Sequence, residues 1–196
     1  MTPTTSAPST TTPSTTPLLG ALVDEVRETV SQGLPPELTA FLTGERLAPY
    51  LAADDLLTDA QREGDPERYR QHLLHAEADG SFSIVALVWL PGQYTAIHDH
   101  VSWCVTGVYE GEESERRYRL VPAAEPGGTA RLVATGDVVN PAGSVCGFAP
   151  PGDIHRVRNA CTGTAISIHI YGADIARLGT SVRRVYALAT DAAAAA

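Results

Sequence analysis

From Phe82 onward the chain is a succession of short segments with the pattern of β-strands, and this run restricts the fold more than any other feature. The segments are rich in β-branched residues, and Gly, Pro or Asn turns separate them. They are SFSIVALVWL, VSWCVTGVY, ERRYRLVPA, ARLVATGDVVN, VCGFA, IHRVRNA and TAISIHIYG. Many short strands at regular spacing predict a mainly β fold, a closed barrel or sandwich, with helices packed outside.

The residues before this run, from 18 to about 70, have a helical pattern. LVDEVRETV places Leu22, Val26 and Val30 on one face, and the Gly- and Pro-rich GLPP run that follows ends this helix. TGERLAPYLAADDLLT is a second amphipathic stretch, and DPERYRQHLLHAEA is predicted to start a short third helix.

The two ends of the chain differ from the rest in composition. Residues 1–17 contain only Met, Thr, Pro, Ser and Ala, which cannot bury enough apolar area to offset chain entropy, so we expect a disordered leader. It lacks the basic start and apolar core of a signal peptide. Residues 191–196 form an Ala-rich tail that we expect to fray. The sequence thus predicts a single domain over residues 18–190.

Charge and cysteine content narrow the function classes. The formal net charge is −9, which argues against a nucleic-acid partner or an anionic membrane surface. No apolar run approaches the length of a membrane span. Three cysteines without regular spacing do not make a disulfide framework, so we expect a cytoplasmic protein.

Two stretches carry candidate metal ligands. His98 and His100 are two residues apart, so on a strand both imidazoles project from the same face and can share one metal ion, whereas Asp99 points the other way. In the second stretch, PPGDIHRVRN, a Pro-Gly turn precedes His155, a third nitrogen ligand. A single histidine of this kind is more often a hydrogen-bonded polar residue, so the prediction depends on the combination.

A further polar set lies in AISIHIYGADI. Isoleucines alternate there with Ser167, His169 and Tyr171, which predicts a strand with one aliphatic and one polar face. A ladder of hydroxyl, imidazole and phenol indicates groups that bond to one another in an enclosed place. Such a ladder without catalysis is the alternative interpretation.

These residues resemble the cupin superfamily. Gly92, His98, His100 and Gly111 match its first motif, with Cys104 where most cupins have a glutamate ligand. The second motif is matched by Pro150, Gly152, His155 and Asn159, although its leading glycine is one residue out of place, with Gly143 the nearest. The resemblance implies a cupin barrel with a neutral three-histidine site.

A three-histidine cupin with Cys in the glutamate position resembles the thiol dioxygenases of the cysteine dioxygenase family. That family has a Ser-x-His-x-Tyr run, matched by Ser167, His169 and Tyr171. The resemblance implies Fe²⁺ on the three histidines, a small thiol and O₂ as substrates, and a sulfinic acid product. It also implies that Tyr171 points at the iron, supported by His169 and Ser167. Cys104 occupies the position that in animal members is joined to this tyrosine by a thioether, and an even spacing from His100 points it into the same cavity.

The resemblance also bears on the substrate. Animal members bind the carboxylate with Tyr-x-Arg, where this chain has Tyr69 and Gln71. Bacterial relatives with Gln there resemble 3-mercaptopropionate dioxygenases, whose carboxylate-binding arginine follows the Ser-x-His-x-Tyr strand. VRRVY offers Arg184, with Arg183 beside it, and a shift of one residue in the match would favour Arg70 instead. L-cysteine and 3-mercaptopropionate therefore both remain candidates.

Two other function classes are compatible with a cupin. A non-redox, metal-dependent enzyme such as a sugar-phosphate isomerase normally keeps the glutamate ligand and binds zinc or manganese. A ligand-sensing cupin without catalysis would not need a tyrosine aimed at the metal.

Overall fold

The structure, a computed structural model, describes residues 15–123, 125 and 129–188. The helical elements are α1 (Pro17–Ser31), α2 (Pro36–Leu47), the 3₁₀ helices η1 (Ala48–Ala52) and η2 (Asp59–Arg62), and α3 (Ile175–Leu178). The strands are β1 (Arg70–Ala76), β2 (Ser83–Trp89), β3 (Ile97–His100), β4 (Cys104–Glu110), β5 (Glu112–Val121), β6 (Arg131–Pro141), β7 (Val145–Phe148), β8 (His155–Asn159), β9 (Ala165–Tyr171) and β10 (Val182–Tyr186).

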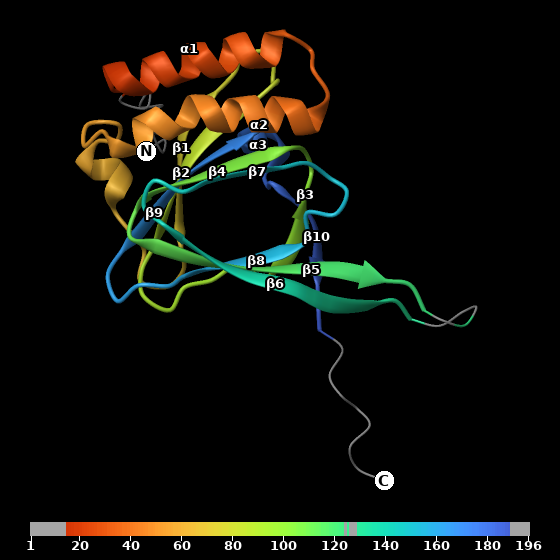
Figure 1. Cartoon of the computed structure of the whole chain (residues 1–196). Helices are drawn as coiled ribbons and strands as arrows, with labels where there is room; N and C mark the ends of the chain where they lie inside the picture. Colours follow the sequence, from red (N-terminus) through yellow and green to blue (C-terminus); the bar gives the residue numbers. More distant parts are fainter. Residues whose placement is uncertain (1–14, 124, 126–128, 189–196) are drawn as a thin grey trace, which may run out of the picture.

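The strands form two antiparallel sheets that face each other (Figure 1). The first, which we call the upper sheet, has the order β1-β2-β9-β4-β7, and the lower sheet has the order β10-β3-β8-β5-β6. The chain crosses repeatedly between the two sheets, as in a double-stranded β-helix. The predicted mainly β cupin fold is confirmed.

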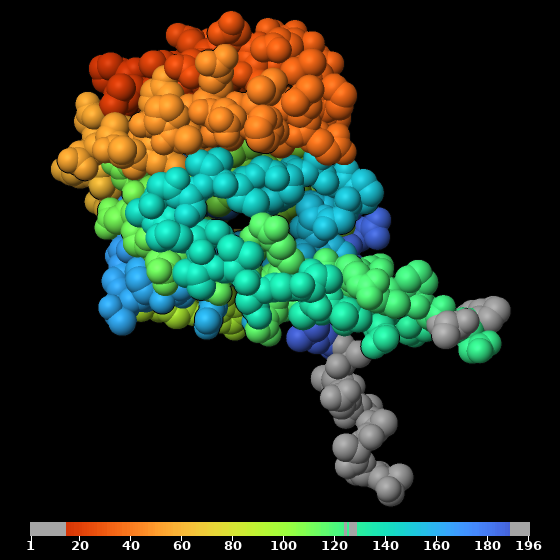
Figure 2. All heavy atoms as spheres, viewed as in Figure 1, coloured from red at the N-terminus to blue at the C-terminus, as the bar shows by residue number. Residues whose placement is uncertain are grey.

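Helices α1 and α2 cover the outer face of the upper sheet (Figure 1). The space-filling view shows them as a continuous layer, with a hollow in the barrel wall below (Figure 2).

Thr16 caps α1, its side chain accepting a hydrogen bond from the Leu19 amide and donating one to the Leu56 carbonyl. Thr16 and Pro17, which the sequence assigned to the leader, therefore belong to the first helix. Residues 1–14 of that leader and the predicted tail lie outside the described residues.

Alternation along the central strands separates two interiors. On β9, Ile166, Ile168 and Ile170 face the helices, where they join a buried aliphatic cluster with α1 and α2. The intervening Ser167, His169 and Tyr171 face the inside of the barrel. Period-two geometry alone produces this division, because successive side chains of a strand point to opposite faces.

No helix within the described ranges has the length and apolar character to cross a membrane.

Two of the helix predictions need correction. The second helix starts at Pro36, because the proline cluster that ends α1 also supplies the favourable N1 proline of α2. Pro49 then limits the following turns to the 3₁₀ helix η1. The predicted third helix is wrong, because Arg70–Ala76 is strand β1, paired antiparallel with β2. Pairing with a fully buried neighbour overrides the helix-compatible local sequence.

A glycine of the first motif is required by the backbone. Gly111 has a φ of 74° in the turn between β4 and β5. A Cβ atom there would lie 2.7 Å from the Thr164 carbonyl oxygen, which is too close for any side chain. The turn returns the chain to the lower sheet, where β5 pairs with β8 and so supports the strand that carries His155.

Candidate metal centre

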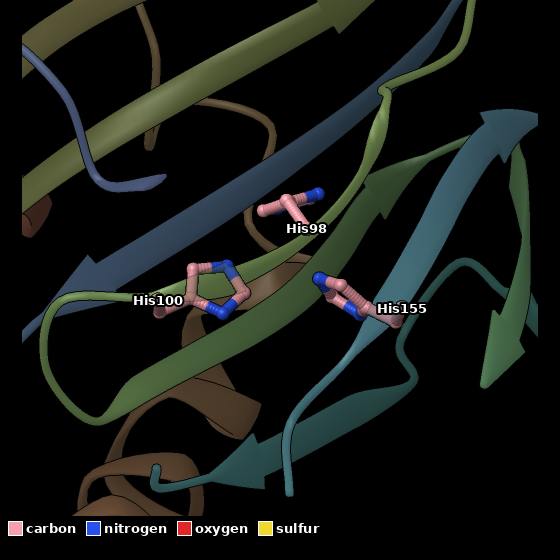
Figure 3. Close-up of side chains that lie close together, drawn as sticks. All are labelled: His98, His100 and His155. Carbon is pink, nitrogen blue, oxygen red and sulfur yellow. The ribbon is translucent and has the colours of Figure 1, made fainter. Parts of the chain in front are cut away.

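Three buried histidines face one another inside the barrel (Figure 3). His98 and His100 come from β3, and His155, the first residue of β8, lies directly opposite His98 in the strand register. Their ring centroids are 4.8–5.0 Å apart. One ligand nitrogen from each ring lies within 4.8 Å of the others. The three nitrogens are therefore close enough to be candidates for a single shared ion.

Each ring is oriented by a hydrogen bond from its Nδ1 atom. His98 Nδ1 lies 2.9 Å from the Ala96 carbonyl oxygen. His100 Nδ1 lies 3.0 Å from Asp153, and His155 Nδ1 lies 2.8 Å from Glu115. A carbonyl or carboxylate partner makes Nδ1 the protonated nitrogen, so that Nε2 is left to bind a metal. Ligand tautomers are therefore set before any ion binds.

Burial favours neutral imidazoles at the centre. It is the main reason why the pKa of His98 falls to about 3, and His155 and His100 lower this pKa further. Burial also opposes ionisation of Glu115, but hydrogen bonds from His155 and Arg117 outweigh it and lower the pKa of Glu115 to about 2. The centre thus combines a neutral His98 with a negatively charged Glu115 one layer out.

This donor set fits a divalent metal with open coordination positions. Among the described residues, the three histidines are the only cluster of His, Cys, Asp and Glu close enough to share an ion. Imidazole nitrogens suit iron, zinc, copper and nickel, whereas magnesium and calcium prefer oxygen ligands. Three protein ligands leave at least one position for water or substrate.

Asp99, between two of the histidines, belongs to a separate network. Its side chain accepts hydrogen bonds from Arg183 and from the Tyr186 hydroxyl, the latter at 2.8 Å. It therefore lies on the opposite face of β3 from His98 and His100, as the two-residue period requires. Arg183 is occupied by this carboxylate.

Ser167, His169 and Tyr171 form a continuous hydrogen-bonded chain. Ser167 Oγ lies 2.9 Å from His169 Nε2, and the Tyr171 hydroxyl lies 3.1 Å from His169 Nδ1. The rings of Tyr171 and His100 have centroids 6.0 Å apart, so the chain ends beside the histidine cluster. Burial, followed by the charges of the three cluster histidines, lowers the pKa of His169 to about 3, so its ring is neutral at physiological pH.

Cys104 lies next to the end of this chain. It is fully buried at the start of β4 and is paired directly with Tyr171 across the upper sheet. Burial raises the pKa of its thiol well above the usual value, with smaller effects of Thr106, Cys146, Asp153 and Tyr171. Cys104 is therefore an uncharged thiol beside the tyrosine, and it is not part of the cluster that can share an ion.

The histidine cluster opens into a cavity of about 480 Å³. Its lining includes Tyr69, Gln71 and Arg184, the three residues that the sequence indicated for substrate binding. Arg183 also lines it. The ring of Tyr69 lies 4.5 Å from that of Trp89, centroid to centroid, and Trp89 forms one wall. Segments far apart in the sequence, from β1, β9 and β10, thus meet around one space.

Sequence reasoning missed the residues that orient the ligands. Asp153 accepts from both the His100 amide and its ring, and Glu115 holds His155. Asp153 is two residues before His155 in the PPGDIH stretch, and this closeness in sequence to a ligand could have indicated it. Glu115 had none, because it reaches His155 only through the pairing of β5 with β8.

Comparison with known proteins adds a family match. The model of the family "Cysteine dioxygenase type I" matches residues 60–178, more than half of the chain. A Thermus thermophilus protein of solved structure is 21% identical, with 60% of this chain and 96% of that chain covered and a TM-score of 0.42. An RmlC-like cupin protein of Desulfovibrio desulfuricans is 22% identical over 56% and 88% of the two chains, with a TM-score of 0.39. A recombinant oxalate oxidase in complex with glycolate is 17% identical over 63% and 62%, with a TM-score of 0.42.

Proposed function

The chain belongs to the cysteine dioxygenase type I family, and from this premise we propose that it is a non-haem iron thiol dioxygenase. Its reaction would add both atoms of O₂ to the sulfur of a small thiol carboxylate and so yield a sulfinic acid. The observation that carries the proposal is the all-histidine donor set, in which Asp153 and Glu115 face the outer ring nitrogens instead of the shared point. A non-redox cupin that needs a carboxylate ligand is not favoured by this arrangement.

We assign Fe²⁺ to His98, His100 and His155. When bound there, iron supplies the redox chemistry that joins dioxygen to sulfur. The protein's own part is positioning, since holding the reactants side by side converts an encounter into an intramolecular step. Tyr171 would orient the reacting thiol or the incoming oxygen through its hydroxyl, an electrostatic role. His169 and Ser167 would hold that hydroxyl in place.

The charge of the cavity supports 3-mercaptopropionate over L-cysteine. A carboxylate needs a cation, and Arg184 has no carboxylate partner within the described part of the chain, whereas Arg183 is engaged by Asp99. Arg70, the alternative, faces Glu63 at 3.5 Å. No Asp or Glu is among the described residues that line the cavity, so the ammonium group of cysteine would have no counter-charge. We therefore assign the carboxylate to Arg184, with Gln71 and Tyr69 beside it.

Oxygen consumption tests the proposal. The iron-loaded protein, supplied in turn with 3-mercaptopropionate, L-cysteine and cysteamine, should consume O₂ fastest with the first, and mass spectrometry should detect the corresponding sulfinate. Cysteamine, which has an ammonium but no carboxylate, serves as the matched control for Arg184. Iron-loaded protein that consumes no O₂ with any of the three thiols would reject the function. Faster turnover of L-cysteine would reject only the substrate assignment.

The free state of all three cysteines agrees with the cytoplasmic location that we propose.

A further inference from the structure

A buried carboxyl group lies at the far end of the Ser167–His169–Tyr171 chain. Glu113, on β5, is only 1% exposed, and its Oε1 atom has no hydrogen-bond partner among the described residues. Its side chain interacts with those of Ser167 and Trp89. The Trp89 indole also donates to Ser167 Oγ at 3.2 Å. A carboxyl group without water or a full set of partners is costly to bury, so its presence here requires a reason.

The hydrogen bonds that join Ser167, His169 and Tyr171 can run in one of two directions. His169 is neutral, so one ring nitrogen carries a proton and the other accepts one. If Nε2 carries it, His169 donates to Ser167, Ser167 donates onward, and the Tyr171 hydroxyl must donate to Nδ1. If Nδ1 carries it, every bond reverses: Ser167 donates to His169, His169 donates to Tyr171, and the Tyr171 hydroxyl is free to donate into the cavity.

Glu113 is placed to select between these directions. As a carboxylate it only accepts, so it draws the Ser167 proton toward itself and favours the first arrangement. As a carboxylic acid it donates to Ser167, whose own proton then goes to His169, which favours the second. In both arrangements Ser167 keeps the hydrogen bond from Trp89, so no heavy atom has to move.

We propose that Glu113 is the fourth member of this chain and sets the direction of its protons, so that Tyr171 donates into the cavity only while Glu113 is protonated. Glu113 is thus a positioning residue that acts through Ser167 and His169. The assignment of a donor role to Tyr171 rests on the proposed function, whereas the direction of the chain does not.

The surroundings of Glu113 allow it to change protonation. Burial raises its pKa to about 7, although Ser167 lowers it, and Glu115 raises it through negative charge. A cavity of about 20 Å³ borders Glu113, and Thr106, Asn140 and Ser144 contribute polar groups to it. This volume accommodates one water molecule, which would pair with Oε1 and carry its proton. The other titratable groups that line this space are Glu115 on the same strand, Cys146 on β7 and His155 on β8. His169 on β9 lies beyond Ser167, to which it is hydrogen-bonded.

The tautomer of His169 reports the direction directly. Nitrogen-15 NMR of the full-length protein, loaded with zinc as a diamagnetic metal, distinguishes Nδ1–H from Nε2–H rings. Over a titration from about pH 5 to about pH 9, His169 should change from the Nδ1–H to the Nε2–H tautomer as Glu113 ionises. Glu113→Gln should keep one tautomer throughout. Glu112→Gln, a change of the same kind on a half-exposed neighbour in β5, should titrate like the wild type.

The outcomes are separable. A wild-type His169 that keeps one tautomer across the titration, or a Glu113→Gln protein that still changes it, would overturn the proposal. If Glu113→Gln fails to fold, the wild-type titration decides alone. In the iron-loaded enzyme, kcat for 3-mercaptopropionate should fall as pH rises through the same transition, and Glu113→Gln should lose that step without a matching change in KM. A tautomer change in a protein that oxidises no thiol would retain the role of Glu113 and reject the proposed function.

Discussion

The two faces of β9, in the middle of the upper sheet, are both buried but differ in chemistry. On β9, Ile168 is 0% exposed and faces the helices, whereas the adjacent His169 is 5% exposed and faces the barrel interior. The outer face is aliphatic, and any well-packed apolar side chain of suitable volume can serve there. The inner face depends on hydrogen bonds with defined donors and acceptors, so a change of chemistry matters more there than a change of volume. Burial alone therefore does not tell a structural residue from a functional one.

The largest difference between the effects of inner-face and outer-face substitutions is expected at the metal ligands. His155→Ala should abolish iron retention and thiol oxidation, because two histidines hold the ion too weakly. The protein should still fold, with a modest loss of stability because the buried Glu115 loses one of its hydrogen-bond partners. Iron content measured together with thermal unfolding tests this. His72→Ala is the matched control, since His72 hydrogen-bonds a backbone carbonyl away from the cavity. Full iron content in His155→Ala would remove this residue from the metal centre.

The outer face should show the converse behaviour. Leu22→Ala leaves a cavity under α1, where Leu22 is 0% exposed, and should lower the free energy of unfolding by about 2–5 kcal/mol. The fraction that remains folded should bind iron normally. Leu38→Ala, on α2 but 43% exposed, should have little effect in the same urea titration. Equal losses in the two variants would contradict the assignment of the helix layer as the stabilising core.

In the cavity, the role of Arg184 can be tested with two thiols that differ in their carboxylate. Arg184→Ala should cost on the order of 2–5 kcal/mol in transition-state binding of 3-mercaptopropionate, because the substrate carboxylate loses its cation. Oxidation of cysteamine, which has no carboxylate, should change far less. The measurement is kcat/KM for both thiols. An equal loss for both would show that Arg184 acts on the fold of β10 and does not bind the carboxylate.

The smallest expected effect concerns a covalent bond between two side chains of the inner face, Cys104 and Tyr171. Cys104 is paired with Tyr171, and we expect that a thioether can form between them during turnover without being required for activity. Intact-protein mass spectrometry after many turnovers should then detect the loss of two hydrogens. The loss should be absent from Cys104→Gly, which should remain active. An unchanged wild-type mass would exclude the link and leave the dioxygenase proposal in place.

Local periodicity was sufficient for much of the fold. The strand segments from Phe82 onward, the first helix and the two faces of β9 follow from patterns that repeat within a few residues. The same period predicted that His98 and His100 share a face and that Asp99 does not. It failed for β1, where the local pattern is compatible with a helix and only pairing with β2 selects the strand.

What the sequence determined by itself was therefore the class of fold, the ligand candidates and the Ser167–His169–Tyr171 ladder, because each depends on spacing within one strand or turn. Tertiary structure alone decided which partners meet. Glu115 reaches His155 only through the pairing of β5 with β8. Glu113, in the lower sheet, reaches Ser167, in the upper sheet, only because the two sheets face each other. The irregularity between Val182 and Arg184 likewise shifts the register of β10 against β3. It lies at Arg183, whose guanidinium forms an ion pair with Asp99. The physical reason is that side-chain direction is a local property, whereas register is set by the summed packing and hydrogen bonding of whole strands.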